Sequence, residues 1–223
     1  MAVNHSVFRE IVAALGKNVQ LVAVSKTKPL SDIQEIYGMG QRDFGENYVQ
    51  ELVEKQKQLP NEIRWHYLGH LQTNKVKQIA PFVHLIQAVD SVRLLEEIDK
   101  QARKCNRIID CLLQVHIAKE ETKFGFDEKE LNSLFVSDGT ILPGMKNIRV
   151  RGLMGMATLT EDNNLIREEF RQLHSLFQSF HKGLVFGDAF DTLSMGMSSD
   201  YRIAIEQGST MVRIGSLLFG KRK

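Results

Sequence analysis

The sequence predicts an α/β protein with one domain over residues 1–223, a (β/α)8 barrel of the TIM type with an additional N-terminal helix. Eight short segments rich in Val, Ile and Leu have the pattern of strands, and helical patterns alternate with them. This alternation indicates parallel pairing through right-handed crossovers, and eight units suggest a closed barrel. The length of 223 residues is near the lower end for that fold. A doubly wound open sheet is the alternative, but it would normally place a glycine-rich turn after the first strand, where residues 25–29 contain no glycine.

The expected strands are short and mostly apolar on both faces, as parallel strands covered by helices are. The first is a run of small and branched apolar residues that leads into Lys26 and that Pro29 ends. In chain order, the strands are expected over residues 21–26, 42–47, 63–69, 83–89, 108–117, 148–156, 192–195 and 210–214.

The N-terminal helix is expected over about residues 4–16, because apolar residues recur there at helical spacing and Gly16 ends the pattern. Two later helices begin with start signals: Ser31 and Gln34 form a capping-box pattern, and Asp127 opens an acidic first turn. Helices are expected over residues 31–38, 48–59, 73–80, 91–104, 127–135, 162–180 and 198–207, after the first seven strands.

The composition indicates an ordinary protein surface. Charged residues make up 25% of the chain and the net charge is +2, so no bulk field favours nucleic acid or an anionic membrane. No apolar run approaches the roughly 20 residues of a membrane helix, and the N-terminus lacks the apolar stretch of a signal peptide. Two cysteines, Cys105 and Cys111, fit a reducing compartment. We therefore expect a cytoplasmic monomer without nucleic-acid or membrane partners.

Lys26 stands where the first strand meets its loop. The active face of a parallel barrel lies at the C-terminal ends of the strands, and Lys26 is the only lysine expected there. Partial desolvation at the end of an apolar strand lowers the pKa of a lysine and makes it a nucleophile or a Schiff-base former. On local sequence alone, a surface lysine whose stem packs along the strand end is the commoner case.

Two loops at the same face have the composition of anion sites. Gly215 and Ser216 follow the last strand and can present backbone N–H groups and a hydroxyl. Residues 194–199 lead from the seventh strand into a helix. Many barrels bind phosphate with these two loops, although either loop alone is equally well explained as a turn or cap. Arg213, inside the last apolar strand, must have partners or line a cavity; it could donate to a ring nitrogen or form a structural ion pair.

His66 and His70 are four residues apart, a spacing that pairs metal ligands on a helix. Here they are expected on a strand and its exit, where four residues span about 13 Å, too far to share one ion. No third His or Cys has a matching spacing, so we expect no metal site.

Five motifs occur in order between Leu21 and Gly220: VSKTK at 24–28, FGENYVQE at 44–51, WHYLGHLQTNK at 65–75, LSMGMS at 193–198 and MVRIGS at 211–216. Together they resemble the motifs of the pyridoxal phosphate homeostasis protein family, formerly labelled proline synthetase co-transcribed proteins. That family is similar in fold to the N-terminal barrel domain of alanine racemase.

The resemblance implies a site for pyridoxal 5′-phosphate (PLP), held as a Schiff base on Lys26. It places Asn47 near the ring and Arg213 at the pyridine nitrogen. Ser194, Gly215 and Ser216 are implied to hold the phosphate. The family commonly has threonine at position 216, and serine keeps the hydroxyl and the amide. The loop at 118–125 departs from the family pattern, because Ala118 replaces a serine in its usual opening, so we assign it no role.

Two functions remain open. The resemblance implies a PLP-binding protein of intracellular vitamin B6 homeostasis, not an enzyme, that buffers PLP or delivers it, with apo PLP-dependent enzymes as candidate partners. The alternative is a PLP-dependent racemase or decarboxylase of a small amino acid. A racemase needs a base on each face of the Cα carbanion, and the second base of alanine racemase comes from a domain that this sequence is not expected to contain. An arginine at the pyridine nitrogen also weakens the electron sink. A cofactor-free Schiff-base aldolase would need a proton relay beside Lys26, for which Glu46 is the candidate.

Overall fold

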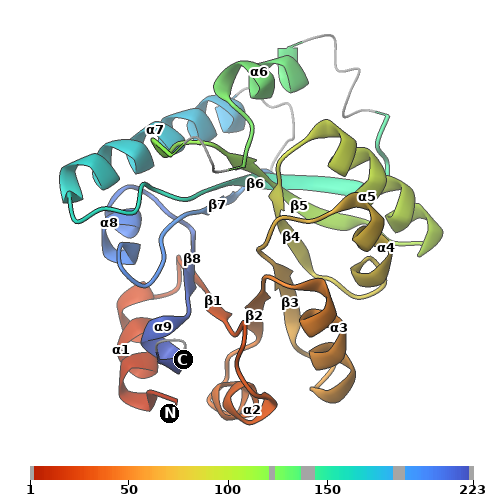
Figure 1. The fold of residues 1–223 in the computed structure, drawn as a ribbon. Coiled ribbons are helices and arrows are strands. Elements are labelled where there is room, and N and C mark those ends of the chain that lie inside the picture. The colour runs from red at the N-terminus through yellow and green to blue at the C-terminus, as the bar shows by residue number, and fades with distance from the viewer. Residues whose placement is uncertain (1–2, 121–123, 137–143, 183–188, 221–223) are drawn as a thin grey trace.

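Eight parallel strands close into a barrel at the centre of the molecule, which confirms the predicted fold (Figure 1). The computed structural model describes residues 3–120, 124–136, 144–182 and 189–220. Strands follow one another around the barrel in chain order, and β1 closes it by pairing with β8. The strands are β1 Gln20–Val24, β2 Asp43–Glu46, β3 Arg64–Tyr67, β4 Leu85–Val89, β5 Ile109–Val115, β6 Ile148–Gly155, β7 Thr192–Ser194 and β8 Met211–Ile214.

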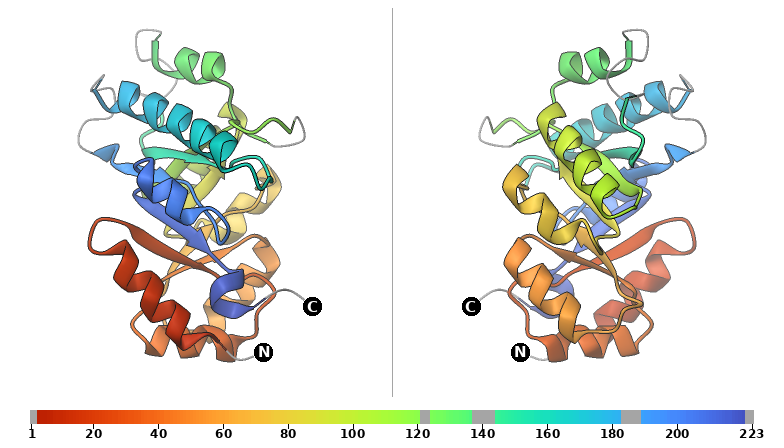
Figure 2. Two further views of the ribbon diagram at one scale, coloured as in Figure 1. Left: turned by 90° about the vertical axis from the view of Figure 1, so that its left-hand side faces the viewer. Right: turned by 90° about the vertical axis from the view of Figure 1, so that its right-hand side faces the viewer.

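Helices surround the barrel, as the two side views show (Figure 2). They are α1 His5–Leu15, α2 Leu30–Gly38, α3 Val49–Gln58, the 3-10 helix η1 Thr73–Lys75, α4 Val76–Ile79, α5 Val92–Lys104, α6 Glu128–Val136, α7 Asn163–Lys182, α8 Tyr201–Glu206 and α9 Ser216–Phe219. The N-terminal segment is tied to the end of the chain, because the Asn4 N–H donates to the Leu218 carbonyl at 2.9 Å. Among the described residues, no helix has both the length and the apolar character needed to cross a membrane.

Three boundaries differ from the prediction at the face where strands end. β1 stops at Val24, so Lys26 lies in the turn that follows rather than in the strand. The helix expected from Ser198 begins only at Tyr201, because residues 195–200 form a loop in which Gly196 has φ +96°. A short helix, α9, follows β8 and was not predicted, since four residues give too little periodicity to recognise.

The two predicted helix starts have different outcomes. At α6 the capping box is confirmed: the Glu130 N–H donates to Asp127 Oδ1, and the Asp127 N–H donates to Glu130 Oε2. The capping box expected from Ser31 is wrong. α2 begins one residue earlier, at Leu30, where the fixed φ of Pro29 sets the entry of the chain, and no side chain caps it.

The core has two parts. A large apolar cluster lies between the strands and the helices. A smaller one fills the barrel and contains Val22, Leu85, Ala88, Leu112, Met154 and Met211. The buried polar side chains include His66, Gln87, Ser194 and Arg213. Buried polar groups require partners, and the partners of these four are described below.

Candidate functional site

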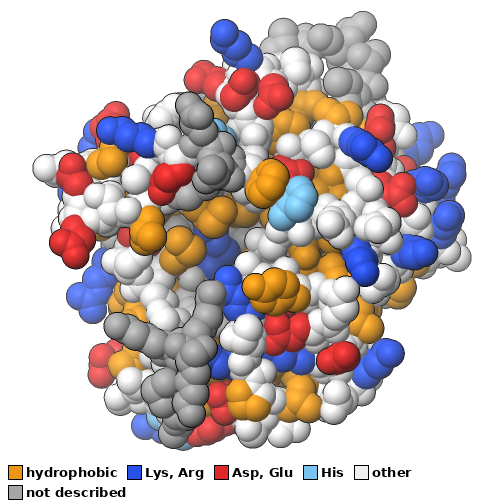
Figure 3. Space-filling view, viewed as in Figure 1, with side chains coloured by type: hydrophobic (Ala, Val, Ile, Leu, Met, Phe, Trp, Pro, Cys, Tyr) orange, Lys and Arg blue, Asp and Glu red, His pale blue; other side chains and the backbone are white. Residues whose placement is uncertain are grey.

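A cavity of about 450 Å³ opens at the C-terminal ends of the strands. Of the six predicted site residues, Lys26, Asn47, Arg213, Gly215 and Ser216 line it, and Ser194 does not. Its other lining residues are Val24, Lys28, Leu68, Met154, Met156, Leu159, Met197, Ser198, Ser199 and Gly220. In Figure 3, Lys and Arg side chains lie among hydrophobic ones near the centre of the face. The cavity therefore combines apolar walls with a few cationic and hydroxyl groups.

Two hydrogen bonds with α3 fix the turn that carries Lys26. Thr27 has φ 63°, a left-handed conformation that a β-branched residue adopts only when its surroundings impose it. On the near side of Lys26, Lys55 Nζ donates to the Ser25 carbonyl at 2.8 Å. On the far side, the Thr27 N–H donates to Glu51 Oε1 at 2.6 Å. Both partners come from α3, so this helix sets the position of the lysine backbone.

Glu46 completes this arrangement, which we call the lysine-turn clamp: Ser25, Glu46, Glu51 and Lys55. The fully buried Glu46 Oε1 accepts from Ser25 Oγ at 2.6 Å and from Lys55 Nζ at 2.8 Å. Burial raises the pKa of Glu46 to about 7, although the neighbouring Lys55 opposes the shift. Glu46 bonds to α3 on the outside of the barrel and does not line the cavity, so the structure gives it no place in a proton relay beside Lys26.

Asn47 is placed by a close approach between two loops. A Cβ atom at Gly69 would lie 2.2 Å from the Asn47 carbonyl oxygen, so only glycine fits there. The Tyr67 hydroxyl donates to the same carbonyl at 3.1 Å, and burial raises the pKa of Tyr67 to about 12, which keeps it protonated as a donor. The β3 exit therefore holds the β2 exit in place.

The loop after β8 contributes Gly215 and Ser216 to the cavity lining, and the Gly215 N–H donates to Ser198 Oγ at 3.3 Å. The first N–H groups of a helix have no acceptor within it, and α9 begins at Ser216. Gly215 packs closely on β1, since a Cβ atom there would lie 3.1 Å from the Val24 carbonyl oxygen. At the other end of α9, Lys28 Nζ donates to the carbonyls of Phe219 and Gly220 at 2.7 and 3.1 Å.

Arg213 is a buried cation with neutral hydrogen-bond partners. Its side chain donates from Nη1 to Ser194 Oγ at 2.7 Å and from Nη2 to the Gly155 carbonyl at 2.9 Å. Burial lowers the pKa of Arg213 to about 10, and Asp200 partly opposes this shift. The guanidinium remains charged at neutral pH and lines the cavity.

Ser194 is not among the residues that line the cavity, and its expected contact with a phosphate stays a prediction. Its fully buried hydroxyl accepts from Arg213 and donates to Gln87 Oε1 at 2.7 Å. Ser198 and Ser199 of the same loop line the cavity instead. The sequence alone does not distinguish these serines, because which of them faces the cavity depends on the path of the chain after β7 ends at Ser194.

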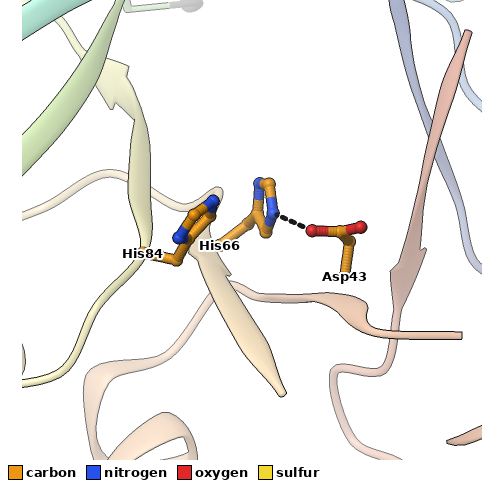
Figure 4. Close-up of side chains that lie close together, drawn as sticks. All are labelled: Asp43, His66 and His84. Atoms are coloured by element: carbon orange, nitrogen blue, oxygen red, sulfur yellow. Dashed lines mark hydrogen bonds and ion pairs between the residues drawn. The ribbon is translucent and has the colours of Figure 1, made fainter. Parts of the chain in front are cut away.

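The structure brings together three potential metal ligands that the sequence analysis did not group. Asp43 begins β2, His66 is the third residue of β3 and His84 directly precedes β4, and their ligand atoms lie within 4.8 Å of one another (Figure 4). Both Asp43 oxygens already accept from Arg64, at 2.7 and 2.5 Å. A guanidinium in that position repels a dication, so the cluster is better described as an ion pair with neighbouring imidazoles. His70 bonds elsewhere, to Asp90 Oδ2 at 2.8 Å.

The loop at 118–125, which departs from the family pattern, lies only partly within the described residues, since 121–123 fall outside them. In its described part, the Lys119 N–H donates to Thr158 Oγ1 at 3.0 Å.

Comparison with known proteins agrees with the geometry. Residues 3–223 match the family described as "Alanine racemase, N-terminal domain". The pyridoxal phosphate homeostasis protein of Aquifex aeolicus is 41% identical over 213 residues, covering 95% of this chain and 91% of that protein. The human protein of the same name is 38% identical over 213 residues, covering 91% and 76%.

Solved structures extend the comparison. PipY of Synechococcus elongatus without PLP is 34% identical, has a TM-score of 0.88, and is matched over 96% of this chain and 99% of its own. PipY with PLP bound has a TM-score of 0.84 with the same identity and coverage. Alanine racemase from Bartonella henselae shares the fold alone, with 17% identity, a TM-score of 0.68, and 95% of this chain matched to 57% of its length. The chain therefore belongs to the alanine racemase N-terminal domain family and, within it, to the pyridoxal phosphate homeostasis proteins.

Proposed function

We propose that this protein binds PLP covalently on Lys26 and serves PLP homeostasis as a carrier that buffers or delivers the cofactor. The observation on which the proposal rests is the single cavity that joins Lys26, the buried Arg213 and the N–H groups after Gly215. A lysine, a cation and an anion-binding loop are the groups needed to hold a phosphorylated aldehyde with a ring nitrogen. The relatives described above are named for the same cofactor.

The residues present fit PLP. A cavity of about 450 Å³ is within the usual range for small-molecule sites. Val24, Leu68, Met154 and Met156 offer apolar walls for a planar ring. Ser198, Ser199 and Ser216 offer hydroxyls, and the N–H groups at the start of α9 offer donors for a phosphate.

Each residue then has a defined task. PLP when bound supplies an aldehyde, whose carbon forms a double bond to a lysine nitrogen with release of water. Lys26 provides the amine, and the lysine-turn clamp fixes its backbone. Arg213 has only donors, so it would bond a ring nitrogen through that atom's lone pair and keep it unprotonated. The β3 exit holds Asn47 at the cavity, where it would contact the ring.

A carrier is favoured over a racemase or decarboxylase by the groups that face the cavity. Among the described residues, the titratable side chains that line it are Lys26, Lys28 and Arg213. Lys28 is bonded to two carbonyls, and an arginine stays protonated. The described residues that line the cavity therefore offer no carboxylate, histidine or tyrosine as a second acid or base. Delivery to apo PLP-dependent enzymes, a cytoplasmic location and a monomeric state belong to the same proposal.

The test is the visible absorbance of the purified protein with PLP, before and after borohydride, followed by peptide mapping. We expect a yellow band that reduction removes, and a pyridoxyl mass on the peptide with Lys26. Lys26→Ala should abolish covalent attachment while the apo-protein melts at the wild-type temperature, since the side chain lies in a turn outside the core. Lys100→Ala, at an exposed position of α5, is the matched control. A colourless protein that takes up no PLP would refute the proposal, and turnover of amino acids by the loaded protein would favour the enzyme alternative.

A further inference from the structure

We infer that Gln87 and His66 are positioning residues that orient Arg213 through a hydrogen-bonded chain along the inside of the barrel. The inference rests on the proposed function, because it concerns how Arg213 meets the ring of PLP. The hydrogen bonds run from Arg213 at the cavity through Ser194, Gln87 and His66 to Asp43 at the opposite end of the barrel. We call these five residues the interior chain.

The links are short and almost completely buried. Arg213 donates to Ser194 Oγ at 2.7 Å, Ser194 Oγ donates to Gln87 Oε1 at 2.7 Å, and Gln87 Nε2 lies 3.0 Å from His66 Nδ1. His66 Nε2 lies 3.1 Å from Asp43 Oδ1 (Figure 4). Ser194, Gln87 and His66 are fully buried, and Asp43 and Arg213 are 5% and 4% exposed. At this depth, loss of one link would leave a buried polar group without its protein partner, so each link constrains the next.

The direction of every bond follows from Arg213. A guanidinium has no acceptor, so Ser194 Oγ must accept from it, and the single Ser194 proton then goes to Gln87 Oε1. This orients the Gln87 amide with its nitrogen toward His66 and toward Met211 Sδ, 3.1 Å away. His66 Nδ1 must accept, which leaves the proton on Nε2 to be donated to Asp43. The charge at the cavity thus fixes the tautomer of His66, which is connected to Arg213 through Ser194 and Gln87.

The interior chain is anchored at Asp43 by an ion pair with Arg64. Burial raises the pKa of Asp43, but hydrogen bonds from His66 and Arg64 outweigh it and hold the pKa well below the usual range. The Asp43 carboxylate therefore stays ionised and accepts the hydrogen bond from His66. Its two bonds to Arg64 prevent it from rotating. With both ends fixed, one by the Asp43–Arg64 pair and one by the Gly155 carbonyl, the guanidinium plane is held before any cofactor arrives.

The interior chain makes a prediction about the wild-type protein without PLP. Histidine side-chain nitrogen NMR should show His66 as the neutral tautomer with its proton on Nε2. Addition of PLP should shift the His66 nitrogen signals through Arg213, whereas His174, which contacts Gln178 on α7, should not shift. A proton on Nδ1 of His66 in the apo-protein would overturn the inference. The measurement on the apo-protein needs no variant and no PLP, so its result stands even if PLP binding at Lys26 fails.

The second test is Gln87→Leu, which removes the central link with little change in volume. We expect PLP to bind about tenfold more weakly, the loss typical of one hydrogen bond to a charged group, and the absorbance maximum of bound PLP to shift because the donor at the ring nitrogen is displaced. Gln101→Leu is the matched control, since Gln101 is a buried glutamine that bonds only to Glu97 on its own helix in the described structure. A purely structural role for Gln87 would lower the melting temperature and leave the absorbance maximum unchanged, and that result would also overturn the inference.

Discussion

Replacing Lys55 by methionine should loosen the turn that holds Lys26 while leaving the barrel intact. Lys55 is 5% exposed and its ammonium makes three charge-assisted hydrogen bonds, to the Ser25 carbonyl, Glu46 and Glu51, at 2.6–2.8 Å. Methionine matches the stem of lysine but donates nothing. The substitution therefore removes the cation from the lysine-turn clamp and leaves Glu46 buried without its counter-charge.

The magnitude follows from the burial of the pair. Removing one partner of a buried ion pair costs about 3–5 kcal/mol. Glu46 can take up a proton at neutral pH because its pKa is already about 7, so we expect the lower end of the range, about 3 kcal/mol. For a chain of this length, each kcal/mol lowers the melting temperature by about 2–4 °C. The expected fall is thus about 6–12 °C.

The assay is thermal unfolding of the apo-protein, paired with PLP titration. Lys57→Met is the matched control, because Lys57 lies on the same helix but is exposed; it should change the melting temperature by less than about 2 °C. The double variant Lys55→Met with Glu46→Gln should recover much of the loss, since it removes the buried carboxylate together with its partner. PLP affinity should fall in the single variant. Wild-type stability and wild-type PLP affinity in Lys55→Met would refute the idea that the clamp holds the lysine turn.

Two further predictions concern the same face. Glu46 has a folded pKa of about 7 against an ordinary 4.5, so it binds more protons in the folded state over that interval and its contribution to stability falls as pH rises from 4.5 to 7. Denaturant unfolding should show the stability of the wild type falling relative to Glu46→Gln by up to about 3 kcal/mol across this window; parallel curves would contradict the assignment. Gly69→Ala should weaken PLP binding by displacing Asn47, whose carbonyl oxygen is 2.2 Å from the added Cβ, whereas Gly38→Ala, with open space around it, should bind PLP normally.

The barrel and the identity of the cavity loops could be predicted because both depend on strand order. Once eight alternating units are recognised, the exits of the first and last strands must be neighbours, and this brings Lys26 to Gly215 and Ser216. Arg213 was expected to have partners or line a cavity, and the structure shows both.

The polar networks could not be predicted because they depend on strand register. Ser194 pairs with Met211 across β7 and β8, and this register determines that the serine hydroxyl meets Arg213 beneath the cavity. The clamp combines β2 with two positions of α3, where Glu51 and Lys55 have the spacing of any exposed helical ion pair. Periodicity shows neither that this pair is buried nor that it faces a turn.

The two buried cations near the cavity differ in how their charge is balanced, and the difference bears on binding. Lys55 bonds the carboxylates of Glu46 and Glu51 directly, so the positive charge of its ammonium is neutralised by adjacent negative charges. Arg213 forms no ion pair in the described part of the chain; its hydrogen bonds go to a hydroxyl and a carbonyl, and burial lowers its pKa to about 10. Burial of a cation without a bonded counter-ion disfavours the apo-protein. An anionic ligand in the cavity would offset part of that desolvation cost, and this offset would contribute to the affinity for PLP.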